Sequence, residues 1–250
     1  MVRNLTLEKL RAGQPSFGLA MAMKDPIVAE YLGRSGIDWI WIDEQHGSLG
    51  YEAMGAVIQI IGLTGTAPIV RLGSNDFFRI GRALDAGALG VIVPMVNSVE
   101  DAEAVVHAAK YPPAGGRSSG GARLQLLGAD YAKEADANTL VAVMIETRRA
   151  VESVAEIAAV EGVDCLFIGP SDLSVSLGVE PGSDEHEAAI TEVLEQAAAA
   201  HKPAGIACGS VEDAVLRAEQ GFKFPLAGSE LGMIRRGIAH AQEQLGLMAH

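Results

Sequence analysis

Several polar side chains stand directly after short apolar runs, at positions where the carboxyl ends of strands are expected. Carboxylates there can bind a divalent cation, a histidine can take up a proton, and an arginine can stabilise a developing negative oxygen. The opposite ends of the same runs contribute few residues of these types. This is the inventory of an active site on a single rim. The residues, in chain order, are Asp43, Glu44, His46, Arg71, Glu146, Ser171 and Asp172.

Two of the carboxylates are expected on neighbouring strands. Glu146 closes the run VAVMIE and Asp172 follows the run CLFIGPS, so the strands that carry them would lie ~4.8 Å apart. Two carboxylates this close either share a proton or bind a cation. A hard divalent ion such as Mg²⁺ or Mn²⁺ suits them, with water or substrate completing an octahedron. The alternative is that Glu146 pairs with Arg148 or Arg71 and that Asp172 caps a helical turn.

Arg71 is the only basic residue at the carboxyl end of an expected strand. It can fork onto a substrate carboxylate or stabilise an enolate oxygen, and it can equally be an internal partner of Asp43. His46 lies among the acids of the same rim and is the candidate general base. The remaining histidines are expected to be solvated: His107, His186, His201, His240 and His250.

Asp85 falls in the last turn of a predicted helix that ends at Gly87, where its charge opposes the helix dipole. A compensating partner is therefore expected, and a histidine N–H bonded there would be oriented and made more basic. The alternative is an exposed Asp85. Among the lysines only Lys223 falls inside an expected strand, at its amino end, so an imine mechanism is not expected.

These residues must be positioned by apolar runs that alternate with Ala- and Glu-rich stretches of helical spacing. Repeated strand and helix units imply parallel pairing, and eight units in 250 residues predict one (β/α)8 barrel domain over residues 1–250. An open doubly wound sheet is the alternative. The expected strands are Phe17–Met21, Trp39–Asp43, Pro68–Arg71, Gly90–Val93, Val141–Glu146, Cys165–Ile168, Ala204–Ala207 and Phe222–Leu226. The expected helices are Tyr51–Gly62, Asp76–Ala86, Val99–Lys110, Arg149–Val160, Glu185–Ala200, Val211–Gln220 and Ser229–Gln244.

A long Gly-containing insert, residues 111–138, separates the fourth and fifth expected strands. Loops of this length in compact domains are usually functional or disordered. Its glycines do not form a GxGxxG pattern after a strand, so the sequence contains no dinucleotide-binding fingerprint. Residues 229–250 are expected to form a C-terminal helical segment.

The chain is acidic, with 32 Asp and Glu against 19 Lys and Arg and a formal net charge of −13. This balance argues against nucleic acid and against an anionic membrane, both of which require a basic face. Cys165 and Cys208 form no CxxC motif, which favours a reducing, cytoplasmic setting. No apolar run approaches the roughly 18 residues that a membrane span needs. A small molecule is therefore the expected partner.

Several segments resemble the HpcH/HpaI aldolase family, and together they span nearly the whole chain. They are IDWIWIDEQHG, PIVRLGSND, LDAGALGVIVPMVNSVEDAE, KYPPAGGRS, VMIETRRAVESVAEIAAVEGVDCLFIGPSDLSVSLG and GSELGMIRRG. The pattern IETxxAV followed by GVDxxFIGPxDLS is highly specific. The resemblance implies a metal-dependent, class II pyruvate aldolase in which Glu146 and Asp172 ligate Mg²⁺ or Mn²⁺, with Co²⁺ as a further candidate.

The resemblance also implies roles for the neighbouring residues. Arg71 would stabilise the enolate, His46 would act as the base, and Asp85 would support His46. The backbone N–H of Ser171 would bind the carboxylate of a 2-oxo acid. The substrate-binding residues implied are Arg71, Gly169, Pro170, Ser171 and Asp172.

Two positions depart from the family pattern. The histidine loop reads DEQH where DGEH is common, so Gln45 stands beside His46. Met144 stands where many members have glutamine, which removes one hydrogen bond to a substrate. Neither change removes a metal ligand, and both bear on substrate identity.

The expected reaction is reversible cleavage of a 4-hydroxy-2-oxo acid to an aldehyde and pyruvate, or a close 2-oxo acid such as hydroxypyruvate. The alternatives are a citrate-lyase-like lyase of CoA thioesters, which the acidic charge disfavours, and a 2-oxo acid decarboxylase or binding protein on the same barrel. The resemblance further implies a homo-oligomer, a hexamer built as a trimer of dimers. In each dimer the C-terminal helix would be exchanged between subunits.

Overall fold

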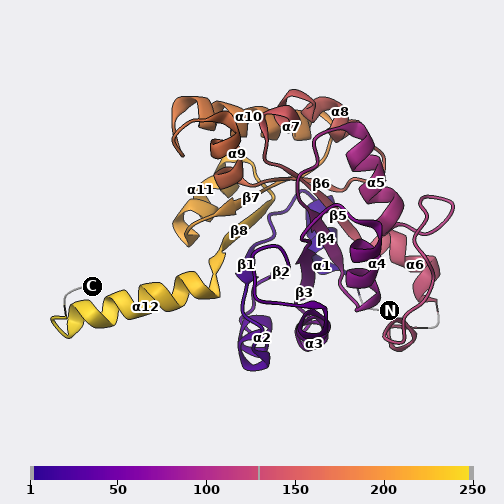
Figure 1. The fold of residues 1–250 in the computed structure, drawn as a ribbon, viewed down its shortest axis with the longest axis horizontal. Coiled ribbons are helices and arrows are strands. Elements are labelled where there is room, and N and C mark those ends of the chain that lie inside the picture. The colour runs from indigo at the N-terminus through magenta and orange to yellow at the C-terminus, as the bar shows by residue number, and fades with distance from the viewer. Residues whose placement is uncertain (1–2, 129, 248–250) are drawn as a thin grey trace.

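The computed structural model describes residues 3–128 and 130–247, which form a closed barrel of parallel strands (Figure 1). The strands pair in sequence order, and β1 closes the barrel against β8. They are β1 (Gly18–Met21), β2 (Trp39–Asp43), β3 (Ala67–Arg71), β4 (Gly90–Val93), β5 (Leu140–Ile145), β6 (Cys165–Ile168), β7 (Ala204–Cys208) and β8 (Phe224–Ser229). The predicted (β/α)8 barrel is confirmed, and the open sheet is excluded.

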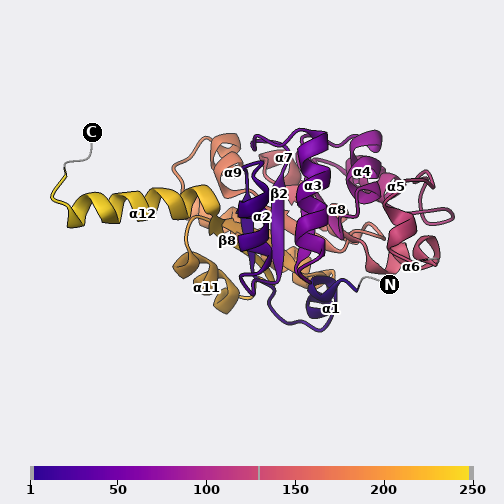
Figure 2. The same ribbon diagram turned by 90° about the horizontal axis from the view of Figure 1, so that it is seen from below.

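Helices surround the barrel, and crossovers between consecutive strands place them outside the sheet (Figures 1 and 2). A first helix precedes β1 and covers the amino end of the barrel, where Asn4 Nδ2 donates to the carbonyls of Leu89 (2.7 Å) and Asn138 (2.9 Å). The helices are α1 (Leu5–Arg11), α2 (Pro26–Gly33), α3 (Tyr51–Gly62), α4 (Phe77–Asp85), α5 (Val99–Ala109), α6 (Tyr131–Asn138), α7 (Arg148–Glu152), α8 (Val154–Ala159), α9 (Pro170–Leu177), α10 (Asp184–Ala199), α11 (Val211–Gln220) and α12 (Glu230–Gln244).

Aromatic side chains fill the inside of the barrel. Trp39 stacks on Phe224 with ring centroids 3.9 Å apart, and Phe167 meets Trp41 at 5.1 Å. A second apolar cluster lies between the outer faces of the strands and the helices. Because the interior is packed with side chains, it leaves no room for a substrate, and the active sites of such barrels lie at the carboxyl ends of the strands.

The largest departures from the sequence expectation concern the insert, the helix after β5 and the last strand. The insert is not wholly a loop: it ends in α6, after a short 3-10 turn at Leu124–Leu126. The helix expected over 149–160 is divided into α7 and α8 at Ser153, whose backbone leaves the helical conformation. β8 begins at Phe224 and extends through Ser229, so Lys223 precedes the strand.

The last helix, α12, projects away from the barrel (Figures 1 and 2). Its main contacts with other elements are with β1 and β8. Several of its apolar side chains are exposed: Leu231, Met233, Ile234 and Ile238, followed by Leu245 at its end. Exchange of this helix between subunits stays a prediction. Within the described ranges, no helix is both long enough and apolar enough to cross a membrane.

Candidate active site at the carboxyl end of the barrel

Glu146 directly follows β5 and is the most buried carboxylate of the carboxyl-end rim, with 1% of its surface exposed. Oε1 accepts a hydrogen bond from the backbone N–H of Met95 at 2.8 Å. Oε2 is buried and has no hydrogen-bond partner among the described residues. Burial raises the pKa of Glu146, the Met95 N–H opposes this rise, and the nearby charge of Asp172 adds to it. One carboxylate oxygen is therefore free for a ligand in a desolvated position.

The Met95 N–H is aimed at Glu146 by an uncommon backbone conformation. Met95 follows β4 and has φ +58°, a left-handed conformation that few residues other than glycine adopt. Asn97 Nδ2 donates to the Met95 carbonyl at 2.8 Å, and Asn97 Oδ1 accepts from Thr147 Oγ1. The residue after Glu146 thus holds the turn that donates to Glu146. The sequence carried no signal for this arrangement.

Asp172 follows β6, the strand next to β5, and belongs to the same rim. It lies in the first turn of α9 and is exposed. It does not cap the helix, because the N-cap position is Gly169, which has no side chain to accept a bond. A Cβ at Gly169 would lie only 2.6 Å from Glu146 Oε2. Glycine at this position therefore leaves the space into which the free oxygen of Glu146 points.

Arg71 and Asp43 form a buried, two-pronged ion pair between register partners of β2 and β3. Arg71 Nε donates to Asp43 Oδ1 at 2.8 Å and Nη2 donates to Oδ2 at 2.7 Å. The alternative in which Arg71 is an internal partner of Asp43 is thus present in the structure. Nη1 makes no hydrogen bond to a described residue, and the charge of Arg71 lowers the pKa of Glu146. One guanidinium nitrogen therefore stays available to a ligand.

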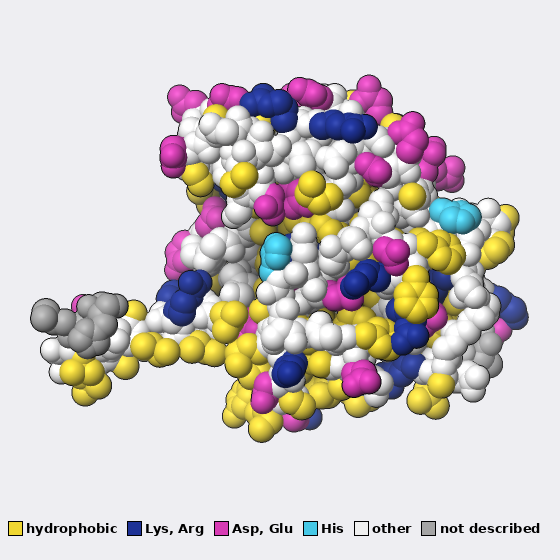
Figure 3. Space-filling view, viewed as in Figure 1, with side chains coloured by type: hydrophobic (Ala, Val, Ile, Leu, Met, Phe, Trp, Pro, Cys, Tyr) yellow, Lys and Arg dark blue, Asp and Glu magenta, His cyan; other side chains and the backbone are white. Residues whose placement is uncertain are grey.

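His46 lies in the loop after β2, and its side chain is exposed on the rim. Asp43 Oδ1 accepts from the backbone N–H groups of Gln45 (3.0 Å) and His46 (3.1 Å), so one carboxylate holds both Arg71 and this loop. His46 also acts electrostatically on Glu146, lowering its pKa. Figure 3 shows the molecule from the side seen in Figure 1, with acidic side chains and a histidine near the centre of that face.

The residues present fit a divalent cation. Glu146 offers a buried oxygen with no other partner, Asp172 adds a second charge, and carboxylate oxygens are the ligands that Mg²⁺ and Mn²⁺ prefer. Throughout residues 3–128 and 130–247, no three His, Cys, Asp or Glu side chains are grouped closely enough to hold a metal ion. Two protein carboxylates would leave most coordination positions to water and substrate.

A profile of the HpcH/HpaI aldolase/citrate lyase family matches residues 16–234. The chain belongs to this family. It is 37% identical over 234 residues to a 5-keto-4-deoxy-D-glucarate aldolase of Shigella boydii serotype 18, covering 90% of each chain. It is 38% identical over 239 residues to a hydroxypyruvate/pyruvate aldolase of Rhizorhabdus wittichii, covering 92% of this chain and 95% of the relative.

A solved structure has the same architecture throughout. The HpcH/HpaI aldolase/citrate lyase family protein from Burkholderia cenocepacia J2315 superposes with a TM-score of 0.92 at 30% identity, covering 97% of this chain and 99% of that one. The protein is thus an aldolase of the HpcH/HpaI family, a carbon–carbon lyase, as the sequence predicts.

The structure of this aldolase does not bring Asp85 to His46 within one chain. α4 runs from the carboxyl end of β3 back to the amino end of β4, so Asp85 lies at the opposite end of the barrel from His46. Its Oδ1 accepts from Arg117 Nη2 at 2.9 Å, and the Arg117 side chain is 1% exposed. Asp85 is therefore partnered by the insert loop, which neither sequence alternative included.

Among the described histidines, His186 is the one whose predicted solvation is wrong, and His250 lies outside the described residues. It is 3% exposed: its Nδ1 accepts from Gly182 N at 3.0 Å and its Nε2 lies 2.9 Å from the Pro170 carbonyl. An acceptor role for Nδ1 assigns the proton to Nε2, which then donates to Pro170. His186 thus fixes the start of α9, from which Ser171 and Asp172 project. Its spacing to Ile190 and Val193, on the buried face of α10, is the signal that places it in the core.

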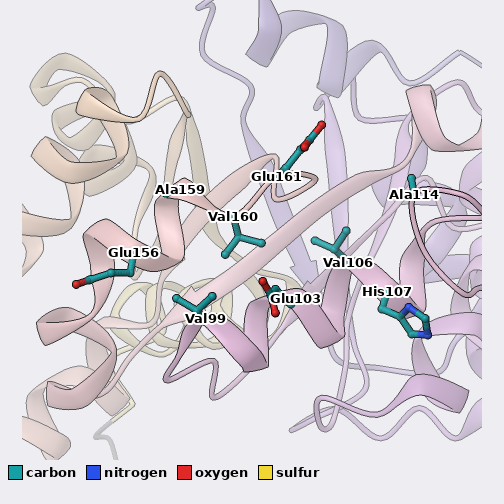
Figure 4. Close-up of a pocket in the computed structure, with 9 residues that line it drawn as sticks. All are labelled: Val99, Glu103, Val106, His107, Ala114, Glu156, Ala159, Val160 and Glu161. Carbon is teal, nitrogen blue, oxygen red and sulfur yellow. The ribbon is translucent and has the colours of Figure 1, made fainter.

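A surface hollow of about 530 Å³ lies away from this rim, between α5 and α8 (Figure 4). Glu103 and His107 line it from α5, and Glu156 from α8. The carboxylates of Glu156 and Glu161 point in different directions and do not converge (Figure 4). The hollow therefore adds no group to the site at the carboxyl ends of the strands.

Proposed function

We propose that this aldolase is a divalent-metal-dependent, class II enzyme that reversibly cleaves a 4-hydroxy-2-oxo acid into an aldehyde and pyruvate, or a close analogue such as hydroxypyruvate. The observation that carries the proposal is the buried, unpartnered Oε2 of Glu146 beside the charge of Asp172. A stable protein does not leave such an oxygen desolvated without a ligand or a proton. The names of the two aldolase relatives support the same chemistry.

Glu146 and Asp172 would hold the cation, Mg²⁺ or Mn²⁺, which would supply Lewis-acid polarisation of the 2-oxo group. Ser171 and Asp172 occupy the first turn of α9, where backbone N–H groups have no intrahelical acceptor and favour an anion. These N–H groups would bind the substrate carboxylate. The planar 2-oxo acid would thus be oriented at both of its polar ends.

Arg71 would stabilise the 2-oxo oxygen, which becomes negatively charged during cleavage. When the bond between C3 and C4 breaks, its electron pair moves onto the 2-oxo group and an enolate forms, while C4 leaves as the aldehyde. Nη1 of Arg71 would donate to that enolate oxygen, because Nε and Nη2 are already held by Asp43. Asp43 therefore orients the guanidinium before the substrate binds.

His46 would take the proton of the 4-hydroxyl group as cleavage proceeds and return it in the aldol direction. Its exposed ring on the loop after β2 can reach a substrate hydroxyl or a bridging water. The enolate would then receive a proton at C3 to give the free 2-oxo acid.

We also propose that the working unit is a homo-oligomer in which α12 packs on a second copy. The exposed apolar side chains of this projecting helix support the proposal, since they would be buried by a partner. In such an assembly Asp85 of one copy would support His46 of another, through the Oδ2 atom that Arg117 leaves free.

The proposed function is tested by incubating the protein with pyruvate and a series of aldehydes, with Mg²⁺, with Mn²⁺ and with excess EDTA, and analysing the products. Aldol products should form with metal and disappear reversibly with EDTA. Full activity in excess EDTA would contradict the metal assignment.

The contribution of a second copy is tested by mixing. His46→Ala and Asp85→Ala variants should each be inactive, and dissociation and reassociation of the mixture should restore part of the activity. No activity should return if one chain supplies both His46 and Asp85 to its site, or if Asp85 does not act on His46.

A further inference from the structure

The first residue of α12, Glu230, is a buried carboxylate for which the proposed reaction has no use. Its side chain is only 4% exposed and turns inward from the junction of β8 and α12. Oε1 accepts hydrogen bonds from the backbone N–H groups of Ala22, at 2.5 Å, and Met23, at 2.8 Å. Oε2 is buried and has no hydrogen-bond partner among the described residues. Glu230 therefore joins the root of α12 to the segment that follows β1.

This link lies where the barrel closes imperfectly. The ladder between β1 and β8 pairs Gly18 with Leu226 and Ala20 with Ser229, with a shift of register between these pairs. Ala22 and Met23 lie beyond the end of β1, and their N–H groups bond to the Glu230 side chain instead of to a strand. One carboxylate oxygen thus accepts from two consecutive backbone N–H groups. The peptide at 22–23 is thus fixed to the start of α12.

Ala22 in turn holds the loop that carries His46. Its carbonyl accepts from Ser48 N at 2.8 Å and from Ser48 Oγ at 3.1 Å. At Gly47 a Cβ would lie 3.0 Å from the Ala22 carbonyl oxygen and 2.1 Å from that of Asp43, so the loop is closely pressed between these two groups. The His46 ring makes no hydrogen bond to a described residue. Its position therefore depends on the backbone that Asp43 holds at one end and Ala22 at the other.

We propose that Glu230 is a positioning residue for the base: by fixing Ala22 and Met23 it sets the placement of the His46 loop and couples that loop to the root of α12. The inference rests on the proposed aldolase function and deepens it. Glu230 makes no hydrogen bond or ion pair with Glu146, Asp172 or Arg71, so its effect should be confined to the step that needs His46.

Two reactions that form the same enolate distinguish the roles of these residues. Aldol cleavage needs a base for the 4-hydroxyl proton, whereas decarboxylation of oxaloacetate releases CO₂ to give the same enolate and removes no hydroxyl proton. Decarboxylation therefore requires Glu146, Asp172 and Arg71 but not His46. A residue that positions only His46 should affect cleavage and leave decarboxylation intact.

The experiment compares Glu230→Gln and Glu230→Ala in the full-length protein with Mn²⁺. The readouts are kcat and KM for cleavage of a 4-hydroxy-2-oxo acid, the pH profile of kcat, and the rate of oxaloacetate decarboxylation. Glu243→Gln, at an exposed position of the same helix, is the matched control. Glutamine keeps one acceptor oxygen for Ala22 and Met23, whereas alanine removes the acceptor from both part-buried N–H groups.

For Glu230→Ala, kcat of cleavage should fall roughly 10- to 100-fold, as expected for a displaced catalytic group. For Glu230→Gln the fall in kcat of cleavage should be smaller. In each variant KM should change little, and the rate of decarboxylation should stay within about two-fold of wild type. Decarboxylation in the same preparation also reports that the variant is folded. An equal loss of both activities, or wild-type cleavage in Glu230→Ala, would overturn the positioning role. If the wild-type protein has neither activity, the proposed function fails, and this inference fails with it.

Discussion

Replacing Gly169 with alanine should damage the proposed metal site without touching a ligand. A Cβ at this position would lie 2.6 Å from Glu146 Oε2, 3.0 Å from Met144 Cε and 3.2 Å from Glu146 Cβ. Ordinary contact begins at 3.4 Å, so the carboxylate oxygen or the start of α9 must move by about 0.8 Å. Met144 is buried and cannot swing into solvent to make room.

The magnitude follows from the geometry that metal sites tolerate. Metal–ligand distances vary by only about 0.2 Å, several-fold less than the displacement that the new methyl group requires. Altered support of a ligand typically costs about 10- to 100-fold in metal affinity. We therefore expect the Kd of the Gly169→Ala variant for Mn²⁺ to rise by at least about ten-fold, with a parallel loss of kcat at subsaturating metal.

The assay is titration calorimetry with Mn²⁺, accompanied by aldol kinetics over a range of metal concentrations. Gly55→Ala is the matched control, because a Cβ at Gly55 meets nothing within 4 Å. In the interior of α3 it should stabilise the protein by about 0.5–1 kcal/mol and leave Mn²⁺ binding unchanged. Wild-type Mn²⁺ affinity in Gly169→Ala would refute the placement of the cation at Glu146 Oε2.

Three further predictions concern the groups around this site. Burial raises the pKa of Glu146 above its ordinary 4.5, so in the metal-free protein it contributes stability at low pH that is lost as the pH rises through the raised pKa. Urea unfolding of the metal-free protein at about pH 5 and about pH 8 should show this loss, and Glu146→Gln should abolish it; an unchanged loss would point to another group. Asp43→Ala leaves Arg71 buried without its partner and should lower the free energy of unfolding by about 3–5 kcal/mol. A change below about 1 kcal/mol would contradict this expectation. His186→Ala removes the bond to the Pro170 carbonyl and should weaken Mn²⁺ binding by about ten-fold, whereas the exposed His240→Ala should not; equal affinities would remove His186 from the support of α9.

The sequence predicts the barrel well because buried parallel strands are continuous apolar runs of β-branched residues. β2, β4 and β6 begin and end at the predicted residues. β8 is misjudged because its sequence, FPLAGS, contains proline, glycine and serine, whereas the preceding Phe222 is an aromatic residue of the kind that favours strands. Pairing with β7 and with the irregular end of β1 decides its boundaries, and neither is visible locally.

The positions of the rim residues along the chain were predictable, but their contacts were not. Asp43 and Arg71 pair because β2 and β3 are in register, which the order of strands alone suggests. The turn at Met95 depends on the contact between Asn97 and Thr147, which are 50 residues apart, and the partner of Asp85 is 32 residues away. No local pattern encodes such contacts, so the support of Glu146 and the environment of Asp85 could be seen only in the folded chain.

The protein has two tryptophans, and both belong to the aromatic packing inside the barrel. The guanidinium of Arg71 lies 4.9 Å from the centre of the Trp41 ring, directly beneath the proposed substrate position. The tryptophan fluorescence of the protein therefore originates inside the barrel, and Trp41 is the emitter next to Arg71. Binding of a 2-oxo acid to Arg71, or of paramagnetic Mn²⁺ near it, should change this emission. Ligand binding can therefore be followed by fluorescence in the unlabelled enzyme.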